Sequence, residues 1–192
     1  MGIRQFEIDL LTNVLKQQNL SFNNIKMMQL GDQIYKDKNM RAKEYFESLG
    51  SLVVSIDIKG EGGSLPIDLS KPINMSEYKE YFDVVTNFGT SEHVSDHMAC
   101  LENMYYFCKK NGILCNFVPR EGHWIDRSHY NAHKYTTNFF YQWADQHNCE
   151  VVLSRIVTIR ERTSGHCNSI HLYGMYDSIL AILKKQETQH GT

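Results

Sequence analysis

The sequence predicts an α/β protein with a doubly wound, mostly parallel seven-stranded sheet, helices on both faces and an antiparallel C-terminal edge hairpin. Short apolar runs alternate with amphipathic segments of about ten to fifteen residues, which is the pattern of repeated strand–helix units. The last two apolar runs have no helical segment between them. This break in the alternation predicts that the sheet ends in an antiparallel edge.

The first half of the chain supplies three strands and two helices. Apolar residues at helical spacing predict both helices, and a glycine after the second one is a common helix end. The β-branched run Ser51-Leu-Val-Val-Ser-Ile-Asp57 predicts a buried strand that ends in an acid. The expected elements are a helix over 4–19, a strand over 25–31, a helix over 39–49, and strands over 51–57 and 65–69.

The second half supplies the remaining four strands, and we expect one domain overall. The predicted elements are a strand over 82–88, a helix over 95–110, a strand over 112–118, an irregular segment over 119–133, a helix over 134–147, and strands over 150–159 and 168–176. The single domain would comprise an N-terminal helix in 1–20, the core sheet in 25–176 and a C-terminal tail in 177–192.

Composition excludes several classes of function. The 192 residues carry a formal net charge of −2 without a block of Lys or Arg, so we expect no nucleic-acid partner. The chain has no run that predicts a membrane span or a signal peptide. Its five cysteines are odd in number and form no Cys-x-x-Cys pair, which favours free thiols and a cytoplasmic setting. The sequence leaves the oligomeric state open.

One segment indicates where a ligand would bind. The strand at 82–88 breaks into the small polar loop Asn87-Phe-Gly-Thr-Ser-Glu-His93, and the next strand opens on Asn111-Gly112. Ligands of open α/β sheets bind beyond the carboxyl ends of the strands. We therefore expect a binding site at that end of the sheet.

These motifs resemble the class I S-adenosylmethionine-dependent methyltransferases, and the small-molecule branch most closely. The resemblance rests on Phe82-Asp-Val-Val, Glu92-His93-Val94 and Asn111-Gly112-Ile-Leu in the family's order, and it covers residues 25–176. It implies S-adenosylmethionine as cofactor and methyl transfer to a small-molecule acceptor. The alternative is a non-catalytic member of the fold that serves as a binding or scaffold protein.

The resemblance also implies a set of cofactor-binding residues at the strand ends. Asp57 would accept hydrogen bonds from the ribose hydroxyls, and Asp68 would accept from the adenine amine beside the Leu69 amide. The alternatives are a surface acid at a turn for Asp57 and a helix-cap or turn acid for Asp68. The full set after these three strands is Asp57, Ile58, Asp68, Leu69, Asn87, Phe88 and Gly89, of which the last three could equally form a strand-terminating turn.

The first loop departs from the family pattern. The family has an acid and then Gly-x-Gly-x-Gly, whereas this chain reads Gln29-Leu-Gly31-Asp-Gln33-Ile-Tyr35. Glycines serve such loops by allowing positive φ angles and close backbone contact. Gly31 and Asp32 are the cofactor-binding candidates here, and either Asp32 or Gln29 could hold the cofactor's amine.

The segment after the fifth strand is the candidate acceptor site. His123, His129 and His133 are candidate bases, because histidine titrates near neutral pH, and Trp124 and Tyr130 are candidate substrate contacts. These histidines could also be solvated loop residues. A metal site is not expected, since only His129 and His133 have helical spacing and no Glu lies between them. His93 either contacts the substrate or orients its own loop.

Overall fold

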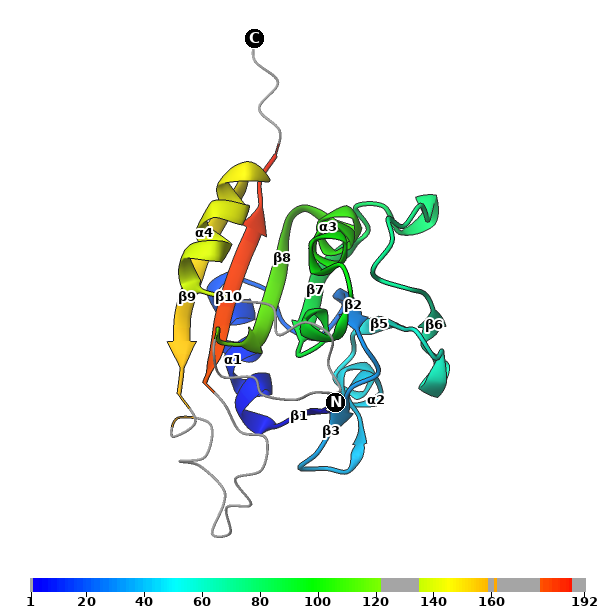
Figure 1. The fold of residues 1–192 in the computed structure, drawn as a ribbon. Helices are drawn as coiled ribbons and strands as arrows, with labels where there is room; N and C mark the ends of the chain where they lie inside the picture. Colours follow the sequence, from blue (N-terminus) through cyan, green and yellow to red (C-terminus); the bar gives the residue numbers. More distant parts are fainter. Residues whose placement is uncertain (1, 122–134, 159–160, 162–176, 188–192) are drawn as a thin grey trace.

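The computed structural model describes residues 2–121, 135–158, 161 and 177–187. A seven-stranded sheet in the order β6-β5-β2-β7-β8-β10-β9 forms its centre (Figure 1). Its strands are β2 (Lys26–Leu30), β5 (Leu52–Asp57), β6 (Leu65–Pro66), β7 (Phe82–Phe88), β8 (Cys108–Pro119), β9 (Cys149–Val157) and β10 (Ser178–Lys185). The order reverses direction at β2, which places a topological switch point between β2 and β7.

Strand directions confirm the predicted mostly parallel sheet. Strands β6, β5, β2, β7 and β8 run parallel to one another. Strand β10 pairs antiparallel with both β8 and β9. The antiparallel strand of the C-terminal hairpin therefore lies one position inside the sheet, and β9 forms the edge.

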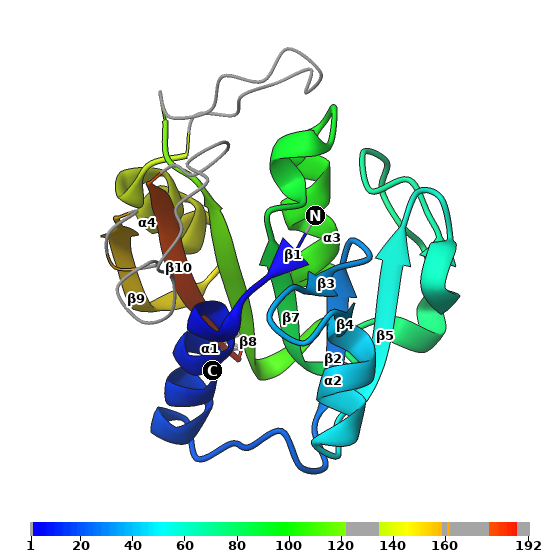
Figure 2. The same cartoon turned by 90° about the horizontal axis from the view of Figure 1, so that it is seen from below.

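Helices cover both faces of the sheet. Helices α1 (Gln5–Gln17) and α2 (Ala42–Ser48) pack on one face, and α3 (His97–Phe107) and α4 (Thr137–Gln146) pack on the other (Figure 2). Successive strand residues alternate between the two cores, so Met27 packs with α1 and α2 while Met28 packs with α3 and α4. The sequence predicted all four helices with ends shifted by a few residues.

The predicted C-terminal tail over 177–192 is wrong for Ser178–Lys185, which forms β10. The five residues Ile179–Leu183 are each at most 1% exposed, because the strand is inserted between two others and has a core on each side. The predicted strand over 168–176 lies outside the described residues.

A second, three-stranded sheet lies next to the first loop. It has the order β1-β3-β4 and consists of β1 (Gly2–Ile3), β3 (Ile34–Tyr35) and β4 (Met40–Arg41). Strand β1 pairs parallel with β3, and β3 pairs antiparallel with β4. The N-terminus of the chain is thereby attached to the segment that follows β2.

Two further expectations from the sequence concern the cysteines and membrane-spanning helices. Cys100, Cys108, Cys115 and Cys149 are free thiols, as expected, and Cys167 lies outside the described residues. In the described part of the chain, no helix has the length and apolar character needed to span a membrane.

Candidate functional site

A pocket of about 510 Å³ lies beyond the carboxyl ends of β2, β5 and β7. This is the end of the sheet at which the sequence predicts ligand binding, and the volume is in the range of small-molecule and cofactor sites. Six of the predicted cofactor-binding residues line it, namely Gly31, Asp32, Asp57, Ile58, Asp68 and Leu69. His93, Thr90 and Ser95 form the wall contributed by the β7–α3 connection.

Gly31 brings the first loop close to the turn after β7. Its φ angle is +77°, and a Cβ atom there would lie 2.6 Å from Thr90 Oγ1. The Thr90 hydroxyl donates a hydrogen bond to the Leu30 carbonyl at 2.7 Å. Any side chain at position 31 would therefore separate the two walls of the pocket, and the first glycine of the family pattern is required here.

The two missing glycines are explained by the second sheet. Gln33 and Tyr35, which stand at their positions, are each 1% exposed. Tyr35 belongs to β3, and the Gln33 amide donates to Thr90 Oγ1 at 3.2 Å. Neither residue has a positive φ angle. The segment therefore forms a short strand with inward side chains, and glycine at these two positions would only remove packing.

Gln29 is buried below the loop and does not line the pocket. It is 1% exposed, and its amide nitrogen donates to the Gly31 carbonyl at 2.9 Å. A carboxylate cannot donate this hydrogen bond. Among the two residues considered for the cofactor's amine, only Asp32 lies at the pocket.

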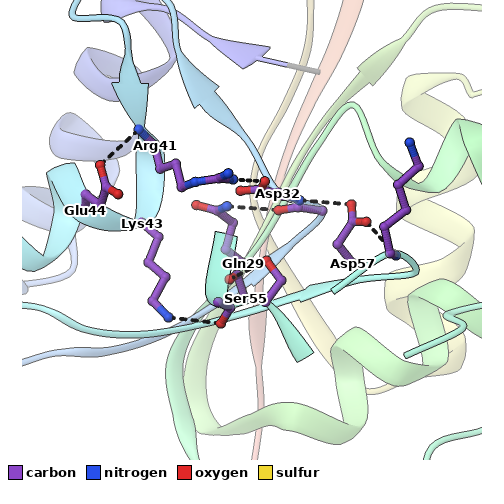
Figure 3. A network of polar contacts seen from close by, with 11 residues as sticks. Gln29, Asp32, Arg41, Lys43, Glu44, Ser55 and Asp57 are labelled. Atoms are coloured by element: carbon purple, nitrogen blue, oxygen red, sulfur yellow. Dashed lines mark hydrogen bonds and ion pairs between the residues drawn. The ribbon is translucent and has the colours of Figure 1, made fainter. Parts of the chain in front are cut away.

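Asp57 and Asp68 present carboxylates from neighbouring strand ends. Asp57 accepts from the Asp32 amide at 3.2 Å and from the Lys59 amide at 2.9 Å (Figure 3). Asp68 accepts from the Ser70 hydroxyl at 2.6 Å and its amide at 3.0 Å. These hydrogen bonds, led by that of the hydroxyl, lower the pKa of Asp68, so its carboxyl is ionised at neutral pH.

The side chains of Asn87 and Phe88, the last two residues of β7, point away from the pocket. The Asn87 amide donates to Ser91 Oγ at 2.8 Å and to Asn116 Oδ1 at 3.0 Å, and its oxygen accepts from two amides of the turn. Phe88 is 6% exposed and belongs to the core under α1 and α2. Asn87, Phe88 and Gly89 do not line the pocket, and their predicted contact through a backbone carbonyl stays a prediction.

Glu92 and His93 bring a buried carboxyl next to the pocket. Glu92 is 1% exposed, and burial raises the pKa of its carboxyl to about 8. Its Oε1 lies 3.8 Å from Nε2 of His93, which lines the pocket. Whether His93 contacts the substrate or orients its own loop stays a prediction.

The predicted acceptor residues His123, Trp124, His129, Tyr130 and His133 lie outside the described residues. Within the part of the chain that the structure describes, no group of three or more His, Cys, Asp or Glu side chains is arranged to hold a metal.

The sequence did not identify the pocket-lining residues Glu61 and Thr90, or the ion pair between Arg41 and the pocket residue Asp32. Thr90 follows directly after Gly89, so its place in the strand-end loop was a usable signal. Arg41 reaches Asp32 from the end of β4, and no local pattern indicates this contact.

Comparisons with known proteins agree on the fold. The sequence matches no protein-family model and no curated protein. Among solved structures, the 1,6-didemethyltoxoflavin-N1-methyltransferase of Burkholderia thailandensis, with 1,6-didemethyltoxoflavin and S-adenosylhomocysteine bound, has a TM-score of 0.62 at 12% identity over 92% of this chain and 76% of that one. The (4+2)-cyclase SpnF has a TM-score of 0.61 at 12% identity over 93% of this chain and 81% of that one.

A third match is the 16S rRNA (adenine(1408)-N(1))-methyltransferase of Catenulisporales acidiphilia. It has a TM-score of 0.52 at 13% identity over 89% of this chain and 90% of that one. The chain has the fold of the class I S-adenosylmethionine-dependent methyltransferases, as the sequence motifs predicted. At these identities the likeness concerns the fold alone.

Proposed function

We propose that the protein is an S-adenosylmethionine-dependent methyltransferase that acts on a small-molecule acceptor. The observation that carries the proposal is the 510 Å³ pocket at the switch point of this fold, lined by Asp57 at the end of β5 and by Asp68 just beyond β6. The toxoflavin-type neighbour methylates a small molecule, and the net charge of −2 gives no general attraction for a phosphate backbone.

The residues of the pocket fit the proposed cofactor. The Asp57 carboxylate can accept hydrogen bonds from a ribose diol, and Asp68 can accept from an adenine amine. Ile58 lines the pocket and is 69% exposed, so its side chain offers an apolar surface to a flat base.

The cofactor would supply an electrophilic methyl group on a sulfonium sulfur. The chain's own contribution is to hold the donor and to position the acceptor for in-line attack with water excluded. An acceptor with a proton to lose would need a base, and His93 is the described pocket residue that could take it.

Calorimetric titration with S-adenosylhomocysteine tests the proposal. The wild-type protein should bind this ligand, and Asp57→Ala should weaken binding about tenfold or more, because a hydrogen bond to a charged group contributes about 1.5–3 kcal/mol. The control is Asp145→Asn, an exposed acid on α4 that does not line the pocket. Folded wild-type protein that binds neither S-adenosylmethionine nor S-adenosylhomocysteine would contradict the proposal.

The alternative of a non-catalytic binding or scaffold protein makes a different prediction. The altered first loop favours this alternative, but the changes in that loop have a local packing reason in the second sheet. SpnF is a cyclase with the same fold, so cofactor binding alone would not establish methyl transfer. Release of S-adenosylhomocysteine with candidate acceptors, measured by mass spectrometry, separates an enzyme from a binding protein.

A further inference from the structure

The pocket wall that carries Asp68 is an irregular stretch of backbone. Residues 67–70 line the pocket, and the chain then continues to a short helical turn that begins at Ser76. The described residues 67–75 contain no helix or strand. The wall therefore has no regular ladder of hydrogen bonds, and its backbone groups need other partners.

Asn103, in the middle of α3, supplies three of these partners. Its amide nitrogen donates to the Leu69 carbonyl at 3.1 Å and to the Lys71 carbonyl at 2.9 Å. Its amide oxygen accepts from the Ile73 amide at 3.0 Å. Among side chains of this size, only a carboxamide combines two N–H donors with a carbonyl acceptor. Asn103 is 2% exposed, so water does not replace these hydrogen bonds.

A second cavity borders the same stretch. It has a volume of about 370 Å³, and Pro72, Ile73 and Asn103 are among the residues that line it. Leu69 packs into the core under α3 and α4, but the residues after it border this open space. Close packing normally fixes buried segments of a protein. Here the hydrogen bonds of Asn103 take over part of that role.

The position of this wall decides which base the pocket can accept. Asp68 accepts from the Ser70 hydroxyl and amide, and its ionised carboxylate can only accept further hydrogen bonds. It can bind the exocyclic amine of a 6-amino purine, whereas the oxygen of a 6-oxo purine is a second acceptor and would be repelled. Lys71 also pairs with this carboxylate but does not line the pocket. Asn103 binds the carbonyls on both sides of Ser70, so it fixes the turn that aims the carboxylate.

We propose that Asn103 is a positioning residue for base recognition, which holds the wall where Asp68 selects a 6-amino purine over a 6-oxo purine. Asn103 lines the second cavity and not the pocket, so it acts on the ligand through the wall. The inference rests on the proposed function, because it assigns the base selectivity of the same cofactor site to a residue behind its wall.

Calorimetry with two ligands that differ at one position of the base tests the inference. S-inosylhomocysteine is S-adenosylhomocysteine with a carbonyl oxygen in place of the amine. The wild-type protein should bind S-adenosylhomocysteine about tenfold or more tightly than S-inosylhomocysteine. Asn103→Leu is close in size and makes none of the three hydrogen bonds. It should weaken S-adenosylhomocysteine binding about tenfold and reduce the preference to about threefold or less.

Two matched variants separate positioning from a general loss of stability. Glu102→Gln changes the neighbouring residue of α3, which lines the second cavity but bonds His147, and it should leave the preference unchanged. Asn103→Gln keeps the donors and the acceptor, and the second cavity has room for its extra methylene group. It should therefore retain more of the preference than Asn103→Leu. Melting curves show that each variant is folded, and Asn103→Ser replaces Asn103→Leu if the latter does not fold.

Hydrogen exchange of the Ile73 amide gives a second readout that needs no ligand. This amide donates to Asn103, so it should exchange about tenfold or more faster in Asn103→Leu than in the wild type. Glu102→Gln should leave its exchange rate unchanged. An equal rate in Asn103→Leu and wild type would show that Asn103 does not hold the wall.

The outcomes separate the two proposals. Wild-type protein that binds neither S-adenosylmethionine nor S-adenosylhomocysteine overturns the proposed function. Two other results overturn the positioning role and leave the proposed function standing. The first is wild-type protein that binds S-adenosylhomocysteine and S-inosylhomocysteine equally well. The second is a folded Asn103→Leu variant in which the ratio of the two affinities equals that of the wild type.

Discussion

At the scale of single residues, Gln29 shows why a departure from a family pattern can be a structural requirement. Its amide donates to the Gly31 carbonyl at 2.9 Å below the pocket, where the family has an acid. A carboxylate at this position would face the Gly31 carbonyl, so two hydrogen-bond acceptors would meet where the Gln29 side chain is now 1% exposed.

Gln29→Glu should therefore destabilise the protein. We expect the free energy of unfolding at pH 7.5 to fall by about 2–4 kcal/mol, because an unpaired carboxylate would be buried. Part of the loss should be recovered at pH 5, where the introduced carboxyl is protonated in the folded protein. The control Gln29→Met removes the same hydrogen bond without adding a charge, and its cost should not depend on pH. Equal, pH-independent losses in urea unfolding would contradict this account.

Glu92 makes a prediction about pH at the same scale. Burial raises the pKa of its carboxyl from 4.5 to about 8, so between these pH values the folded protein holds a proton that the unfolded chain has released. Stability due to this group is therefore complete below pH 4.5 and falls as the pH rises toward 8, by at most about 1.4 kcal/mol per pH unit.

Glu92→Gln removes this titration with little change of shape. The difference in unfolding free energy between variant and wild type should shift in favour of the variant as the pH rises from 5 to 8. Comparing the two proteins cancels the contribution of all other titrating groups. Glu47→Gln, which changes an exposed acid on α2, is the control for the loss of a carboxylate. A flat difference for Glu92→Gln would show that its carboxyl is not buried as described.

At the scale of elements, the end of β10 is fastened to the end of α3 by a buried lysine. Lys185 is 3% exposed, and its ammonium donates to the carbonyls of Tyr105 and Cys108 at 3.0 Å each. It also pairs with Glu80 at 2.9 Å, and this hydrogen bond lowers the pKa of Glu80. The cation thus neutralises the carbonyl end of a helix and an acid from a different loop.

Lys185→Met should lower the free energy of unfolding by about 2–4 kcal/mol, since two carbonyls and a carboxylate lose their donor together. The neighbouring Lys184→Met is the matched control, because among the described residues the Lys184 ammonium bonds only Gln18, at 3.2 Å and in a partly buried position. Urea unfolding at pH 7 measures both variants. A loss for Lys185→Met no larger than that for Lys184→Met would contradict the fastening role.

At the scale of the whole molecule, the sequence predicted the fold better than the site. Strands and helices could be found because their apolar spacing is local. Asp57 and Asp68 could be placed at the pocket because they lie at or just beyond the carboxyl ends of β5 and β6. Asn87 and Phe88 were placed in the pocket by the same rule, yet β7 continues through Phe88 and turns both side chains into the protein.

The remaining features depend on contacts between distant segments. Arg41 reaches Asp32 because the second sheet folds β4 back toward the first loop. Lys185 binds the Tyr105 carbonyl in α3 and the Glu80 carboxylate in a different loop. The run Ile179–Leu183 is continuously apolar, which is the local pattern of a buried strand, so the prediction of a tail missed a usable signal. Its position between β8 and β9, in contrast, depends on contacts with distant segments. Contacts of this kind follow from tertiary packing, which single-sequence patterns do not contain.

The inserted position of β10 also determines the order in which the protein can be completed during synthesis. Strands β8 and β9 are made before it, and in the native sheet they pair with β10 and not with each other. Their facing edges stay open until Ser178–Lys185 has left the ribosome, and open apolar edges are templates for aggregation. A chain interrupted shortly before β10 would thus contain most of the sheet together with two unpaired strand edges. We therefore expect such a chain to aggregate.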